Sequence, residues 1–225
     1  MKYFRSLFIV FLCCLACLNV KSYGQNSPAL KIVQKPVIYN EKRTQLSLLY
    51  LKQRHGLDQK LPVIRPKMIV LHFTGSGTLN SNFNYFNKEE IENARSVNKN
   101  QSSLNVSAHY LVDRDGTVYQ LIPDTLFARH IIGLNYMAIG VENIGGPDAP
   151  LTDAQVKANA ALVKYLCSRH KIDYLIGHSE YAIFRNTALW KETNSGYYTG
   201  KVDPGKDFMQ KVRALVPELK LKSKP

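Results

Sequence analysis

The chain has 225 residues, of which 45% are hydrophobic and 21% charged, and it carries a formal net charge of +13 at pH 7. This length suits one domain with a complete hydrophobic core, and the composition is that of an ordinary globular protein. The sequence contains no internal repeat and no low-complexity block, which excludes repeat and fibrous architectures. The basic balance fits an anionic partner such as nucleic acid, anionic lipid or an anionic polymer.

Residues 1–24 have the layout of a secretory signal peptide. Lys2 and Arg5 precede an apolar core over residues 7–18, and small and polar residues follow it. This core is too short for a membrane span, which takes about 20 apolar residues. We therefore expect cleavage after Gly24, no transmembrane span, and an exported protein that is periplasmic or extracellular.

A lipoprotein signal with Cys17 as the acylated residue is the alternative for this segment, although Cys14 and Leu15 match its pattern poorly. After cleavage Cys167 is the one remaining cysteine, so we expect no internal disulfide. The signal peptide contains three positively charged residues and no acidic residue, so its removal leaves the mature chain with a net charge of +10. Export argues against a nucleic-acid partner and favours the carboxylate-bearing polymers of the bacterial envelope.

Strand and helix patterns alternate along the rest of the chain. We expect residues 25–65 to form an N-terminal extension packed on the main domain, which covers residues 66–225. The expected strands lie within residues 30–39, 68–71, 137–146 and 174–180, with a hairpin over 108–122, and the expected helices lie within residues 43–56, 87–97, 151–170 and 207–216. This order predicts an α/β fold with a mixed central β-sheet flanked by helices.

Local signals fix several of these boundaries. Gly116 is placed for the turn of the hairpin, and Thr152 with Gln155 forms a capping box before the clearest helix of the sequence. Thr44 is the expected cap of the first helix, and Leu46, Leu49 and Tyr50 share one face of it.

Three candidate metal ligands occupy similar places in this fold. His72 and His178 each end an apolar strand pattern, so both imidazoles are expected at one edge of the sheet, where α/β proteins usually build their sites. Asp203 follows in a loop fixed by Pro204 and Gly205. Two histidines and a carboxylate supply three ligands to a tetrahedral zinc ion and leave the fourth position for water.

The motifs of the chain resemble those of the zinc-dependent N-acetylmuramoyl-L-alanine amidases, the type 2 amidases that share their fold with peptidoglycan recognition proteins. The resemblance covers about residues 66–212. It is carried, in this order, by "MIVLHFTGS", "SAHYLVDRDGTVYQLIPD", "ARH", "LNYMAIGVENIGG", "IGHSE" and "KVDPG".

The resemblance implies a fold, a reaction and a set of site residues. The reaction is hydrolysis of the amide between N-acetylmuramic acid and the first L-alanine of peptidoglycan, with one Zn²⁺ ion held by His72, His178 and Asp203. One branch of the family has a tyrosine just before the hairpin histidine, where this chain has Ala108. The other branch has a glutamate that matches Glu142, so Glu142 is the expected general base.

Lys201 matches a family lysine two residues before the aspartate ligand, and we expect it to stabilise the oxyanion of the transition state. His130 and Asn135 match positions beside the substrate groove, which makes them weaker candidates for substrate contact. His130 lacks the family's neighbours, because Arg129 and Ile131 replace a tryptophan and an alanine. Residues 179–200 are a long insertion relative to short family members, and its aromatic residues either line a groove or pack the loop.

Two alternatives to a wall-remodelling or recycling enzyme remain open. A recognition module would keep the fold and bind peptidoglycan or muropeptides without cutting them, whereas a lytic toxin or endolysin would use the same chemistry against another cell.

Overall fold

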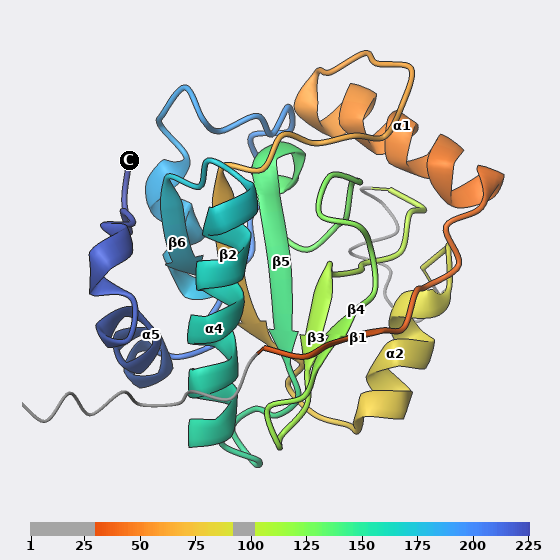
Figure 1. The fold of residues 1–225 in the computed structure, drawn as a ribbon. Coiled ribbons are helices and arrows are strands. Elements are labelled where there is room, and N and C mark those ends of the chain that lie inside the picture. Colours follow the sequence, from red (N-terminus) through yellow and green to blue (C-terminus); the bar gives the residue numbers. More distant parts are fainter. Residues whose placement is uncertain (1–29, 92–101) are drawn as a thin grey trace, which may run out of the picture.

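The computed structural model describes residues 30–91 and 102–225 (Figure 1). The expected signal peptide and the alternative acylation site at Cys17 lie outside the described residues. The strands are β1 (Ile32–Gln34), β2 (Met68–Phe73), β3 (Tyr110–Val112), β4 (Val118–Gln120), β5 (Ala138–Asn143) and β6 (Tyr174–Gly177). The helices are α1 (Glu41–His55), α2 (Leu79–Asn87), α4 (Asp153–Arg169) and α5 (Lys206–Ala214), with short 3₁₀ helices η1 (Asn135–Met137), η2 (His178–Phe184) and η3 (Pro217–Leu219).

The strands form one mixed sheet in the order β1-β4-β3-β5-β2-β6. The β3–β4 hairpin is antiparallel and every other pair is parallel. The mixed α/β fold expected from the sequence is therefore confirmed. Figure 1 shows α4 and α5 on one face of the sheet, while α1 and α2 lie beyond its β3–β4 side.

The two faces of β2 pack against different parts of the chain because successive strand residues point to opposite sides. Ile69 and Leu71 join the core formed with α4 and α5. Met68 and Val70 pack on the other face, against η2 and the segment that follows it. His72 continues the second set, so it emerges on the face opposite α4 and α5.

The hairpin and the longest helix match the sequence-based expectations. Gly116 has φ of +89° and donates its backbone N–H to the Asp113 carbonyl, which closes the turn. The Thr152 hydroxyl accepts the Gln155 backbone N–H, and the Gln155 side chain accepts that of Thr152. These signals are local in sequence, which explains their accuracy.

Helix α1 differs from its prediction in its first residue and in the set of residues that it buries. It begins at Glu41, because the Asn40 side chain accepts the Arg43 N–H and displaces Thr44 as the cap. The expected face is confirmed in part, since Tyr50 is buried and Leu46 packs beside it, whereas Leu49 is 45% exposed. Buried positions of the helix also include several polar residues, namely Arg43, Ser47, Arg54 and His55.

Helix α2 was not expected, because its sequence is polar and rich in asparagine. A capping box between Thr78 and Ser81 starts it, and Phe86 anchors it in the core. The helix expected over residues 87–97 is absent from residues 88–91, and the remainder of that segment lies outside the described residues. No helix in the described ranges is long and apolar enough to span a membrane.

Candidate metal centre

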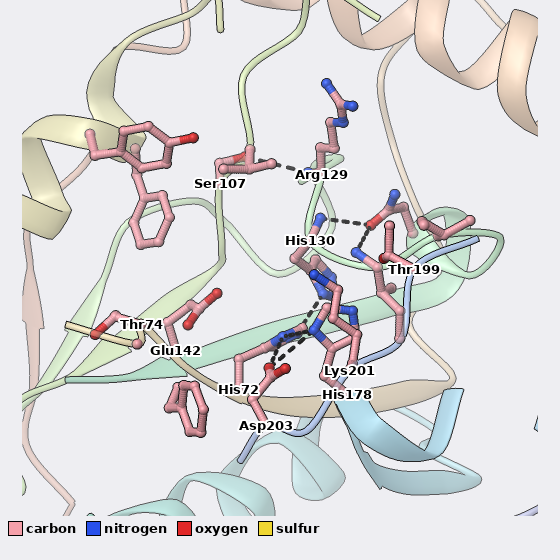
Figure 2. Close-up of a pocket in the computed structure, with 18 of the residues that line it drawn as sticks. His72, Thr74, Ser107, Arg129, His130, Glu142, His178, Thr199, Lys201 and Asp203 are labelled. Carbon is pink, nitrogen blue, oxygen red and sulfur yellow. Dashed lines mark hydrogen bonds and ion pairs between the residues drawn. The ribbon is translucent and has the colours of Figure 1, made fainter. Parts of the chain in front are cut away.

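Three side chains predicted as metal ligands converge at one point in the structure (Figure 2). Nδ1 of His72 lies 3.0 Å from Nδ1 of His178 and 3.2 Å from Oδ2 of Asp203. Nδ1 of His178 lies 3.0 Å from the same carboxylate oxygen. All three residues are buried. The structure therefore brings together residues separated by up to 131 positions in the sequence.

His178 and Asp203 are held in place by contacts between their neighbours. The backbone N–H of Ser179, next to His178, donates to the Asp203 carbonyl at 2.8 Å. Glu180 accepts the backbone N–H of Gly177 and forms a two-contact ion pair with Arg213 of α5. This clamp fixes the start of η2, where His178 is the first residue. Sequence reasoning missed it, although the three-residue spacing from Gly177 to Glu180 matches a helix cap.

Burial shapes the protonation of the three candidate ligands. Burial, together with the neighbouring His72, lowers the pKa of His178 to about 4. Burial alone would raise the pKa of Asp203, but hydrogen bonds with His178 and His72 hold it below its usual value. The carboxylate is thus ionised and the His178 imidazole neutral at pH 7, which are the ligand forms that a metal ion requires.

Glu142 and Lys201 line the same cleft as the candidate ligands. The cleft has a volume of about 570 Å³. One carboxylate oxygen of Glu142, Oε2, is buried and has no hydrogen-bond partner in the described ranges. Burial raises the pKa of Glu142 to about 7, with an opposing contribution from His72. An unpaired carboxylate with a pKa near neutrality has the properties of a general base.

His130 and Asn135 also line the cleft, but both make hydrogen bonds within the protein. Nδ1 of His130 lies 3.1 Å from Nε2 of His72, and Nε2 of His130 lies 3.1 Å from the Ala138 carbonyl oxygen. The Asn135 side-chain oxygen accepts the backbone N–H groups of His130 and Ile131, each at 2.8 Å. Burial lowers the pKa of His130 well below its usual value, so its ring is neutral.

The other histidines lie away from the three ligands. His109 is buried in the core, where Nδ1 accepts the Gly140 N–H and Nε2 faces the Leu126 carbonyl. His170 pairs with Asp124 at the end of α4. His55 ends α1, where a cation would interact favourably with the helix dipole, but burial lowers its pKa to about 4, so the residue is neutral.

Tyr110, whose hydroxyl is another potential proton acceptor, does not line the cleft. Its hydroxyl donates to Asp124 at 2.5 Å, and its ring packs in the core that faces α4. The side chain therefore lies on the opposite side of the sheet from Glu142, and its hydroxyl proton is donated to Asp124.

The aromatic residues of the 179–200 insertion divide between packing and cleft lining. Tyr181 packs against His178, Trp190 and Tyr198, and its hydroxyl donates to the Thr199 carbonyl. Tyr197 lines the cleft. Most of these rings thus hold the loop that leads to Lys201.

Helix α1 supplies part of the cleft wall, which the sequence did not predict. Tyr50 lines the cleft. Arg54 pairs with the buried carboxylate of Glu192 at 2.5 Å, and the Thr193 backbone N–H donates to the Arg54 carbonyl. Nδ1 of His55 lies 3.2 Å from the Lys191 carbonyl. These contacts attach the insertion to α1, so both segments form one side of the cleft.

The fold and this site define an α/β protein with a buried His-His-Asp group at the ends of parallel strands, beside an unpaired carboxylate. Residues 62–206 match the N-acetylmuramoyl-L-alanine amidase family over more than half of the chain. The chain belongs to this family.

Individual relatives are more distant. The endolysin of Escherichia phage T7 is 31% identical over 98 residues, which cover 41% of this chain and 65% of the endolysin. Peptidoglycan recognition protein 3 of Mus musculus is 31% identical over 88 residues, which cover 36% of this chain and 24% of that protein. The matched regions thus span less than two thirds of these relatives.

Solved structures share the fold. N-acetylmuramoyl-L-alanine amidase LysC from Clostridium intestinale superimposes with a TM-score of 0.50 at 20% identity, covering 85% of this chain and 99% of LysC. An AmpD derivative gives a TM-score of 0.51 at 23% identity, covering 82% of this chain and 94% of AmpD. At these identities the similarity establishes the architecture.

Proposed function

We propose that the protein is a zinc-dependent N-acetylmuramoyl-L-alanine amidase. It cleaves the amide that joins N-acetylmuramic acid to the L-alanine of the peptidoglycan stem peptide. The observation that carries this proposal is the convergence of His72, His178 and Asp203 in a cleft that also contains Glu142 and Lys201. Membership of the amidase family and similarity to an endolysin support it.

The donor atoms fit a zinc ion. Zinc at about 2.0 Å from each ligand of a tetrahedron keeps the ligand atoms roughly 3.3 Å apart. The three separations here are 3.0, 3.0 and 3.2 Å. Two imidazoles and one carboxylate match the ligand preference of zinc, and the negative charge of the carboxylate attracts a divalent cation.

The residues of the cleft have separate roles in amide hydrolysis. Zinc in this site supplies a Lewis acid that polarises a carbonyl and acidifies water. Glu142 takes the proton of the attacking water and passes it to the leaving amine, as its unpaired oxygen and raised pKa allow. The ammonium of Lys201 stabilises the negative charge that develops on the carbonyl oxygen. Asn135 supports the cleft wall, where its side-chain oxygen accepts the backbone N–H groups of His130 and Ile131.

The proposal extends to the location of the reaction. Residues 1–24 act as a signal peptide, residues 25–65 form an extension, and residues 66–225 form the amidase domain, which meets its substrate outside the cytoplasm. Mass spectrometry of the secreted protein is expected to find a mature N-terminus at Gln25. A diacylglyceryl group on Cys17 would instead show a membrane-anchored enzyme.

A direct test uses purified protein and defined muropeptides. The zinc-loaded protein is expected to release free stem peptide with an N-terminal L-alanine, identified by mass spectrometry, and chelation of zinc is expected to abolish the release. Binding of muropeptides without any release would instead establish a recognition module. Comparing monomeric muropeptides with intact sacculi separates a recycling enzyme from a lytic one.

A further inference from the structure

We propose that His130 is a positioning residue for the zinc site: it fixes the tautomer and the orientation of the His72 ring. This inference rests on the zinc ligands assigned above. It differs from the role in substrate contact that the sequence indicates for this position. The observation behind it is a chain of hydrogen bonds that runs from His72 to His130 (Figure 2) and on from His130 to the backbone of β5.

The donor and acceptor of each hydrogen bond in this chain follow from its last group, the Ala138 carbonyl. The Ala138 carbonyl oxygen has no hydrogen to give, so Nε2 of His130, 3.1 Å away, carries the hydrogen and donates it. A neutral imidazole has one N–H, so Nδ1 of His130 bears a lone pair and accepts. Nε2 of His72, 3.1 Å from that atom, must therefore be the donor.

The consequence lies at the other nitrogen of His72. In the tautomer with its hydrogen on Nε2, the His72 ring presents a bare lone pair at Nδ1, the atom that faces His178 and Asp203. This is the nitrogen and the tautomer that a metal ion requires. A backbone carbonyl thus selects the metal-binding form of His72 through an intervening histidine ring.

The position of His130 is fixed from two sides. Asn135 accepts the backbone N–H groups of His130 and Ile131, which holds the loop against the sheet. The ring itself lies over Gly140 of β5, where an added Cβ atom would come within 2.6 Å of ring carbon Cγ. Any side chain at position 140 would occupy the place of the His130 ring. The ring meets the His72 ring edge-on, with an interplanar angle of 89°.

Zinc affinity separates a positioning role from a substrate contact. His130→Phe keeps a ring over Gly140 but removes the acceptor for His72 Nε2–H, and we expect zinc to bind roughly 10- to 100-fold more weakly, as measured by competition with a chromophoric chelator. His130→Asn offers an amide oxygen near the original Nδ1 and is expected to restore most of this loss. His170→Phe, at a histidine outside the cleft, is the matched control and is expected to leave zinc affinity unchanged.

An experiment on the unmodified protein removes any dependence on the folding of variants. Long-range ¹H–¹⁵N NMR of the imidazoles is expected to show the Nε2–H tautomer for both His72 and His130, before and after zinc is added. An Nδ1–H tautomer at His130 would overturn the inference. So would unchanged zinc affinity in folded His130→Phe, and a raised KM in that variant would then identify a substrate contact. A wild-type protein that binds zinc but releases no stem peptide would refute the proposed function and leave this inference standing.

Discussion

His72 and Glu142 are register partners in the parallel pair formed by β2 and β5, so their side chains leave the same face of the sheet. Each residue is near the carboxyl end of its strand, where His178 also begins η2 after β6. The adjacency of β5, β2 and β6 thus places the proposed base beside the candidate ligands. Backbone pairing, rather than a flexible loop, sets this separation, so small changes in side-chain chemistry are expected to act without moving the site.

The first prediction concerns metal binding. His72→Ala and His178→Ala each leave two ligands, and two ligands hold zinc poorly. We expect both variants to lose zinc and activity, as measured by elemental analysis after dialysis. His170→Ala is the control and is expected to retain stoichiometric zinc. Full zinc occupancy in either of the first two variants would refute the assignment of ligands.

The second prediction separates chemistry from metal binding at Glu142. Glu142→Gln keeps the shape of the side chain but removes its ability to take a proton, so kcat is expected to fall by roughly 10²- to 10⁴-fold while zinc content and KM stay near wild type. Steady-state kinetics on a defined muropeptide measures this change. Loss of zinc in the variant would show that Glu142 supports the metal, and near-normal kcat would place the base elsewhere.

Lys201 gives the third prediction, because an interaction made only in the transition state lowers kcat and kcat/KM together. Lys201→Met is expected to show this equal loss with full zinc occupancy. Lys206→Met, at an exposed lysine at the start of α5, is the matched control and is expected to have wild-type kinetics. A raised KM with normal kcat would assign Lys201 to substrate binding instead.

The buried pair between Arg54 and Glu192 leads to a prediction about stability. The two side chains are 10% and 1% exposed. Glu192→Gln leaves the Arg54 charge buried without its partner, which is expected to lower the free energy of unfolding by about 3–5 kcal/mol. Urea denaturation measures this loss. Asp58→Asn, which breaks the exposed pair between Lys52 and Asp58, is expected to leave stability almost unchanged. Equal effects of the two substitutions would show that α1 does not depend on this contact with the insertion.

Acid is expected to destabilise the protein through its buried neutral histidines. Burial lowers the pKa of His55 and of His109 to about 4, whereas an unfolded histidine titrates near 6.5. Between these values the unfolded chain binds the proton and the folded chain does not, so stability falls as the pH drops below about 6.5. Each histidine contributes at most about 1.4 kcal/mol per pH unit. Above that pH neither residue contributes a pH dependence.

Comparison of two proteins isolates one of these histidines. Urea denaturation of the wild type and of His55→Gln at pH 7 and pH 5 is expected to show a smaller acid loss in the variant, because one proton uptake on unfolding has been removed. Identical pH dependence in the two proteins would mean that His55 is protonated in the folded state.

Features that depend on neighbours along the chain could be predicted from the sequence. Apolar runs predicted β2, β5 and β6, the Thr152–Gln155 pair predicted the start of α4, and Gly116 predicted the hairpin turn. The candidate ligands and Glu142 followed from strand ends and from family motifs, which are also local. The structure confirms the α/β architecture and brings these side chains into one cleft.

The surroundings of these residues depend on contacts that form only in the folded chain. The hydrogen-bond partners of His130 come from β2 and β5, and the wall made by Tyr50 depends on an ion pair between residues 54 and 192. The buried face of α1 was predicted only in part, because its buried polar side chains find distant partners, as Arg43 does with the carbonyl groups at the end of α2. Such contacts leave no periodic signal in the sequence, because their energy depends on desolvation and geometry that exist only after the sheet has formed.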